Sequence, residues 1–154
     1  MMPLQRVISG GQTGVDQVAL EVAKALGYAT GGTAPKGYRT DAGVNLALRD
    51  VYGLKESWSP QYAPRTIVNV RDADAVVWFG DPTSPGGRLT LESAERLRKR
   101  FRVNPTPEEL CDWLDQWPEH HVVNVAGNRL RTNPSATEAA RAALTYALNE
   151  LVPF

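Results

Sequence analysis

The chain reads VISGGQTGVD over residues 7–16. Its two apolar residues and the glycine-rich turn after them predict a short buried strand that stops at Ser9. Beyond the turn, apolar residues recur at helical spacing, and Gly27 lies where a glycine commonly ends a helix. Thr13 and Asp16 resemble a capping box, with aspartate in place of the usual glutamate. The residues at helical spacing are Val15, Val18, Ala19, Val22, Ala23 and Leu26. The stretch therefore predicts a strand, a glycine turn and a helix.

The same alternation continues along the rest of the chain. Thr106, followed by Pro107 and Glu109, is a strong helix start, and Ser135 with Glu138 resembles another capping box. Glycine and proline over residues 31–53 predict a long loop, and residues 81–87 a second one. We expect strands at residues 28–30, 54–56, 75–79, 101–103 and 121–125, and helices at residues 65–72, 91–100, 106–117 and 135–151. Alternating strands and helices predict an α/β fold: a three-layer sandwich with a mainly parallel sheet, formed by one domain over residues 1–154.

Composition excludes several classes of protein. The 154 residues include 17 Lys and Arg against 17 Asp and Glu, so the formal net charge is zero. A protein held to nucleic acid or to a membrane surface by charge is usually basic, so we expect neither partner. The one cysteine, Cys111, excludes an intrachain disulfide and a multi-cysteine metal site, and we expect no bound metal. The chain has no apolar run long enough to cross a bilayer, so we expect a cytoplasmic protein.

Three glycine turns follow expected strands. They contain Gly10 and Gly11, then Gly86 and Gly87, then Gly127. In an open α/β sheet, ligands bind outside the carboxyl ends of the strands, and helix N-termini there favour anions. The turns therefore predict a cleft for a phosphate or a nucleotide, although none of them is a Walker loop or a dinucleotide fingerprint. The alternative is that these glycines only turn the chain.

Other chemistry-bearing residues fit structural roles better. His120 and His121 are adjacent, so on a strand they would point to opposite faces, which argues against a shared metal. Cys111 lies within an expected helix and is assigned a packing role. Glu92 is either a first-turn charge or a catalytic carboxylate.

The combined pattern resembles the molybdenum-cofactor carrier family, a circularly permuted branch of the Rossmann-like superfamily that includes the LOG-type phosphoribohydrolases. The resemblance rests on SGGQTGVD at residues 9–16, PKG at 35–37 with Arg39, Tyr62 to Asp74 with its Arg-Thr and Asn-Val pairs, GGRLT at 86–90 and NVAG at 124–127. It implies a Rossmann-like fold, a homodimer or homotetramer, and a ligand that carries a phosphate group. In the family that ligand is the molybdenum cofactor, and the superfamily binds nucleotides broadly.

Two positions depart from the related motifs. Arg88 stands where the carrier family usually has threonine, and an arginine there could contact phosphate, block the turn or point to solvent. In the phosphoribohydrolase motif a third glycine occupies the position of Leu89, and Glu92 falls one residue short of the catalytic glutamate. The departures weaken an assignment of Glu92 as catalytic.

We therefore expect a carrier or sensor of a phosphorylated pterin or a nucleotide. The expected ligand-binding residues are Gly10, Gly11, Gln12, Thr13, Gly14, Asp16, Lys36, Arg39, Arg65, Thr66, Asn69, Gly86, Gly87, Arg88, Thr90 and Gly127. The rival hypothesis is a nucleoside monophosphate phosphoribohydrolase, for which Asp16, Asp74 and Glu92 are the candidate carboxylates. A third is a partner-binding subunit that uses Trp58, Trp113 or Trp117 as an anchor.

Overall fold

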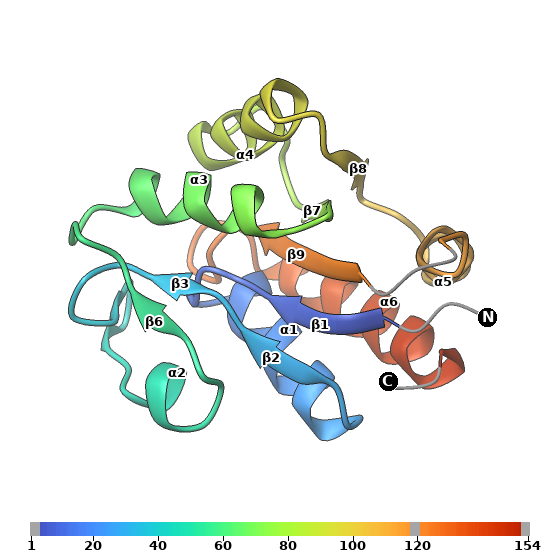
Figure 1. Ribbon diagram of the computed structural model, residues 1–154, viewed down its shortest axis with the longest axis horizontal. Coiled ribbons are helices and arrows are strands. Elements are labelled where there is room, and N and C mark those ends of the chain that lie inside the picture. The colour runs from blue at the N-terminus through green and yellow to red at the C-terminus, as the bar shows by residue number, and fades with distance from the viewer. Residues whose placement is uncertain (1–3, 118–120, 152–154) are drawn as a thin grey trace.

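A computed structural model describes residues 4–117 and 121–151. Its central sheet has five strands in the order β2-β1-β9-β7-β8, and every neighbouring pair is parallel. The strands are β1 (Leu4–Ile8), β2 (Ala29–Gly31), β7 (Ala75–Phe79), β8 (Arg100–Val103) and β9 (His121–Gly127). β9, late in the sequence, lies between the first strand and β7 (Figure 1).

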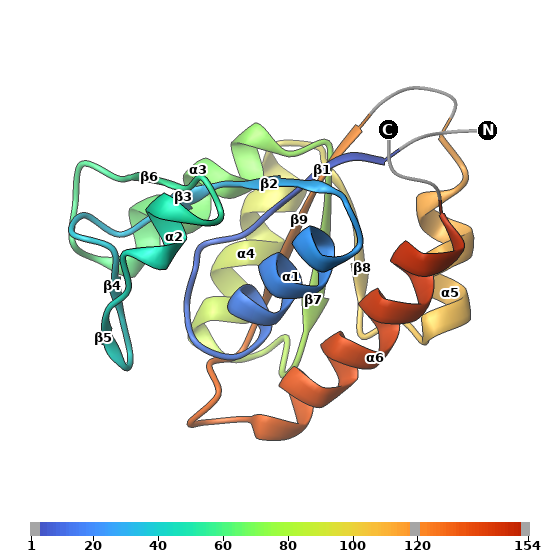
Figure 2. The same ribbon diagram turned by 90° about the horizontal axis from the view of Figure 1, so that it is seen from below.

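Helices cover both faces of this sheet (Figures 1 and 2). Alternate residues of β7 point to opposite faces. Ala75, Val77 and Phe79 join the large apolar core with α1 (Val15–Ala25), α5 (Pro107–Leu114) and α6 (Pro134–Glu150). Val76 packs on the other face with residues of α3 (Tyr62–Asp72) and α4 (Pro85–Arg96). The expected three-layer α/β architecture is confirmed, and it matches a Rossmann-like fold.

The segment expected to be one long loop is instead built from short elements. β3 (Thr33–Ala34) pairs in parallel with β6 (Lys55–Glu56), and β4 (Arg39–Thr40) forms a hairpin with β5 (Gly43–Val44). The short helix α2 (Ala47–Asp50) lies between β5 and β6 in sequence. Leu48 and Leu54 pack against Leu20 of α1 in a small second core. This core attaches the excursion, residues 33–56, to the rest of the molecule.

Short-range signals predicted one helix start correctly, but they missed another start and one helix end. The capping box at Thr106 is confirmed, because its hydroxyl accepts the Glu109 N–H and the Glu109 carboxylate accepts the Thr106 N–H. The one expected at Ser135 is wrong: Asn133 caps α6, and its side chain accepts the Ala136 N–H at 3.2 Å. α5 ends at Leu114, three residues before the expected end at Trp117.

The expected Thr13 cap is also wrong. α1 begins after Gly14, and no side chain caps it. Asp16 bends back instead, and its carboxylate accepts the Gln12 N–H at 3.1 Å. The Thr13 hydroxyl donates to the Gln12 Oε1 at 3.4 Å and does not act as a cap.

Three further expectations concern membrane spans, the histidine pair and the cysteine. No helix in the described ranges is both long and apolar enough to cross a bilayer.

His121 begins β9, whereas His120 lies outside the described residues, so the expected opposite orientation of the two side chains stays a prediction. Cys111 packs at the margin of the large core, in agreement with the packing role.

Candidate functional site

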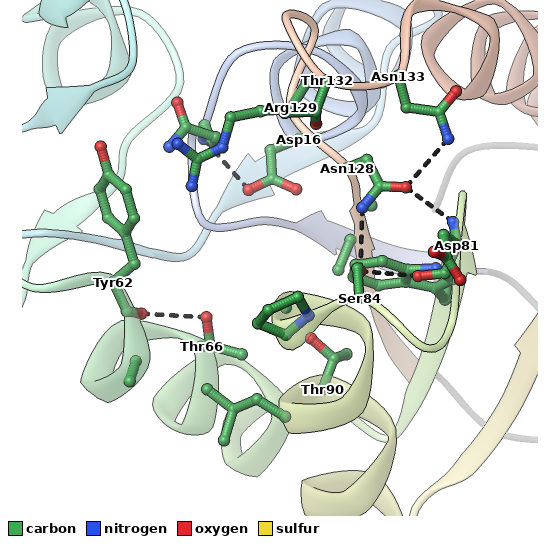
Figure 3. A pocket seen from close by; sticks show the side chains of 18 of the residues that line it. Asp16, Tyr62, Thr66, Asp81, Ser84, Thr90, Asn128, Arg129, Thr132 and Asn133 are labelled. Atoms are coloured by element: carbon green, nitrogen blue, oxygen red, sulfur yellow. Dashed lines mark hydrogen bonds between the residues drawn. The ribbon is translucent and has the colours of Figure 1, made fainter.

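A cleft of about 620 Å³ opens at the carboxyl ends of β7 and β9 (Figure 3). Its walls come from the first turns of α3 and α4 and from the loop that joins β9 to α6. The lining residues are Gln12, Asp16, Tyr62, Ala63, Arg65, Thr66, Trp78, Asp81, Ser84, Pro85, Gly86, Leu89, Thr90, Ala126, Gly127, Asn128, Arg129, Thr132 and Asn133. The volume is within the range of pockets that hold small molecules and cofactors.

The N-terminus of α4 forms one wall. Ser84 is the cap residue: its hydroxyl accepts the Gly87 N–H at 3.2 Å and donates to the Asp81 carbonyl at 2.7 Å. Pro85 has no N–H to offer, and the Gly86 N–H has no hydrogen-bond partner among the described residues. Gly86 therefore presents a backbone donor at the positive end of a helix, which suits an anion. The expected loop at residues 81–87 is shorter than predicted, since α4 already begins at Pro85.

Asn128 fixes this wall to the loop after β9. Its Oδ1 accepts the Asp81 N–H at 2.7 Å and an Asn133 side-chain N–H at 3.1 Å, while its Nδ2 donates to the Ser84 hydroxyl at 3.1 Å (Figure 3). One amide thus connects the end of β7, the cap of α4 and the start of α6. The polar wall is held in place before any ligand arrives.

The first glycine turn is closed by its own side chains. Ser9 accepts the Gly11 N–H, Asp16 accepts the Gln12 N–H, and the Gln12 side chain accepts the Thr13 N–H. A Cβ on Gly11 would lie 2.7 Å from Leu48, and one on Gly14 would lie 2.6 Å from the Leu130 nitrogen. Within residues 10–14, the N–H groups of Gly11, Gln12 and Thr13 already have partners, and the glycines at 11 and 14 permit close packing, so an anion site at this turn stays a prediction.

Arg65 lies beside this closed turn and pairs with Asp16. Its Nη1 is 3.9 Å from the Asp16 Oδ2 and 2.9 Å from the Thr66 hydroxyl. Gly10 leaves room for the guanidinium, because a Cβ there would lie 2.7 Å from the Arg65 Cζ. Burial raises the pKa of Asp16 and lowers the pKa of Arg65, and in each case the partner's charge opposes the shift. The cation expected to meet phosphate thus has an internal carboxylate as a neighbour, 3.9 Å away.

Arg129, absent from the sequence-based candidates, supplies a cation at the mouth of the cleft. Its guanidinium carbon lies 5.4 Å from the Tyr62 ring centroid, and its Nη1 lies 3.2 Å from the Asp41 carboxylate. The side chain reaches over the cleft between Tyr62 and Asp16 (Figure 3). Its position two residues after Gly127 was the only signal in the sequence that could have identified it.

Several expected site residues lie away from the cleft. Asn69 is buried and binds the backbone of Thr33, which donates to its Oδ1 at 2.8 Å and accepts from its Nδ2 at 2.9 Å. Gly87 is buried against the Asp81 and Pro82 carbonyls. Those outside the lining are Gly10, Gly11, Thr13, Gly14, Lys36, Arg39, Asn69, Gly87 and Arg88. The structure brings together Gln12, Asp16, Arg65, Thr66, Gly86, Thr90 and Gly127.

The three candidate catalytic carboxylates are not grouped. Asp74 precedes β7 at its amino end, where its carboxylate accepts the Val122 N–H at 2.7 Å. Glu92 is exposed on α4 and does not line the cleft. Asp16 alone lines it, and its carboxylate is paired with Arg65. Nor do the described residues contain a group of three or more His, Cys, Asp or Glu side chains that could hold a metal ion.

The parallel sheet, with a polar cleft at its carboxyl edge, defines a Rossmann-like fold. Over residues 7–148 the chain matches the model of one family, the circularly permutated YpsA SLOG family, and it belongs to that family. The resemblance stated from the sequence motifs is thereby confirmed.

A solved structure agrees with this assignment. The chain is similar to the "Putative molybdenum carrier protein" from Syntrophus aciditrophicus SB, with 28% sequence identity and a TM-score of 0.82. The similarity covers 94% of this chain and 95% of the other. A search of curated proteins found no match.

Proposed function

We propose that this protein binds a phosphate-bearing small molecule, with the molybdenum cofactor or a nucleotide as the ligand, and that it acts as a carrier or sensor. The observation that carries the proposal is that Gly86, at the start of α4, lines a cleft large enough for such a ligand and has an N–H without a hydrogen-bond partner among the described residues. A phosphate there would accept from Gly86 and gain from the helix dipole.

The rest of the cleft suits the remainder of such a molecule. Trp78, Leu89 and Ala126 offer apolar surface for a planar ring, and Arg129 offers a charge-assisted contact at the mouth. The molybdenum cofactor would be cargo of the protein rather than its resident cofactor. The described residues contain no group of three or more His, Cys, Asp or Glu side chains that could hold a metal ion, and in this proposal the pterin and its phosphate carry the recognition.

The phosphoribohydrolase alternative is not favoured. An oxocarbenium-like transition state needs a carboxylate near the ribose. Asp74 and Glu92 lie outside the cleft, and Asp16 is held in its buried pair with Arg65. The cleft is therefore better suited to holding a ligand than to cleaving it.

Calorimetric titration with AMP and with adenosine tests the proposal. We expect AMP to bind at least tenfold more tightly, since a charged hydrogen bond contributes about 1.5–3 kcal/mol. Arg129→Gln should reduce AMP affinity by about tenfold. Arg141→Gln is the matched control, because Arg141 is exposed on α6 and pairs with Glu21. Equal affinity for AMP and adenosine would contradict a phosphate site, and release of free adenine would restore the enzyme hypothesis.

A further inference from the structure

We propose that Asp41, which does not line the cleft, is a positioning residue for the ligand's anionic group because it orients Arg129 and Gln12. This inference rests on the proposed function. Asp41 lies in the turn between β4 and β5, the hairpin that projects from the body of the molecule (Figure 2). It contacts residues far along the chain, in the loop between β9 and α6.

The Asp41 carboxylate contacts two arginines. It forms a two-point pair with Arg131, with both nitrogen–oxygen distances at 2.8 Å, and a single contact of 3.2 Å with the Arg129 Nη1. Arg131 is largely exposed and does not line the cleft, whereas Arg129 does. Arg131, outside the cleft, therefore supplies the main charge that balances the Asp41 carboxylate. The charge of Arg129 is left to interact with a ligand in the cleft.

Arg129 is held from two sides. Asp41 contacts one of its nitrogens, and the Tyr62 ring lies 5.4 Å from its guanidinium carbon. A free arginine side chain samples many rotamers, and ordering it on binding reduces affinity. The hairpin therefore holds the Arg129 side chain in one conformation before a ligand binds, so that binding loses less side-chain entropy.

Gln12 is a second, independent link between the hairpin and the cleft. The Asp41 N–H donates to the Gln12 Oε1 at 2.7 Å, and the Thr13 N–H donates to the same oxygen at 2.9 Å. With its oxygen committed in this way, Gln12 is 5% exposed, and its Nε2 has no hydrogen-bond partner among the described residues. The backbone and the side chain of Asp41 thus each fix one residue of the cleft wall.

The test compares Asp41→Asn with Asp50→Asn. Asp50 is the matched control: it belongs to the same excursion, pairs with Arg49 at 2.7 Å, and loses the same charge when replaced. Both variants make the protein more positive, so simple electrostatics predicts equal or tighter AMP binding for both. We expect Asp41→Asn to bind AMP at least fivefold more weakly, with adenosine affinity unchanged. Asp50→Asn should change neither.

Two further measurements separate the possible outcomes. Combined with Arg129→Gln, Asp41→Asn should have no additional effect on AMP affinity. Hydrogen exchange of the intact protein should be faster at residues 128–133 in Asp41→Asn and unchanged in Asp50→Asn. Unchanged exchange in that loop, or AMP binding as tight as in the wild type, would overturn the inference. If the wild type binds no AMP, the nucleotide alternative of the proposed function fails, and the exchange data still decide whether Asp41 orders the loop.

Discussion

Arg65 and Asp16 form an ion pair beside the cleft, with 3.9 Å between nitrogen and oxygen and only 11% and 4% of the side chains exposed. Burial disfavours the charged form of each group, and each group's charge opposes that effect on the other. The charged form of each side chain is therefore stabilised by the charge of the other.

Removal of one partner should destabilise the fold. We expect Arg65→Met to lower the free energy of unfolding by about 3–5 kcal/mol at pH 7, because it leaves a buried carboxylate unpaired. Urea unfolding measures the loss. The control is Arg71→Met, which breaks an exposed pair with Asp72 and should cost less than about 1 kcal/mol.

The pH dependence of that loss has a defined sign. Without Arg65, the pKa of Asp16 rises further above its ordinary value of 3.8, since the lowering influence is gone. A carboxyl with a raised folded-state pKa stabilises the fold below the unfolded value and loses that contribution as the pH rises through the folded value. Arg65→Met should therefore be closer to the wild type at pH 5 than at pH 7. A loss that does not vary with pH would argue against this explanation.

Gly127 should not tolerate a side chain. A Cβ at this position would lie 2.6 Å from Val15 and against the Phe79 carbonyl, so Gly127→Ala should cost about 1–3 kcal/mol of stability in urea unfolding. Gly86→Ala is the comparison within the same cleft, because its nearest neighbour would be Trp78 at 3.7 Å. It should fold as stably as the wild type. Equal losses in the two variants would mean that close packing at Gly127 is not the cause.

Asn69 should prove structural. Asn69→Ala leaves the buried N–H and C=O of Thr33 without partners, at about 1–3 kcal/mol for each group. Hydrogen exchange should accelerate at Thr33, and urea unfolding should show the loss. Asn149→Ala, at an exposed position of α6, serves as the control and should leave both measurements unchanged.

Tyr28 should make the protein sensitive to alkali. Burial raises the pKa of its phenol to about 12, and the hydroxyl donates to the Leu148 carbonyl at 3.0 Å. Its contribution to stability is complete below pH 10 and is lost as the pH rises toward 12. Tyr28→Phe should therefore show a shallower fall in unfolding free energy between pH 10 and 12. Identical curves for the two proteins would contradict this role.

Local signals predicted individual elements well. Five apolar residues between Asp74 and Gly80 predicted β7, and Thr106 with Glu109 predicted the start of α5. Each signal acts within a few residues, where hydrogen bonding and apolar periodicity decide the conformation. The predicted Thr13 cap was wrong because Gly14 is the N-cap residue of α1 and the Thr13 hydroxyl contacts the Gln12 side chain.

The site was less predictable because its geometry is non-local. Arg129 enters the cleft only because β9 lies beside β7, and no sequence pattern fixes that pairing. Asn69 looked like a ligand-binding residue, yet its partner is the backbone of Thr33, 36 positions away. A polar residue in a motif can serve a ligand or the backbone, and spacing alone does not separate the two roles.

The central place of β9 has a consequence for synthesis of the chain. On the ribosome, β1 with β2 and β7 with β8 emerge as two separate pairs of parallel strands. In the sheet these two pairs are joined only through residues 121–127, which pair with β1 on one side and with β7 on the other. Until those residues emerge, β1 and β7 each expose an unpaired edge that other nascent chains or chaperones can meet. β9, which comes last in sequence among the strands of the described sheet, therefore joins its two halves.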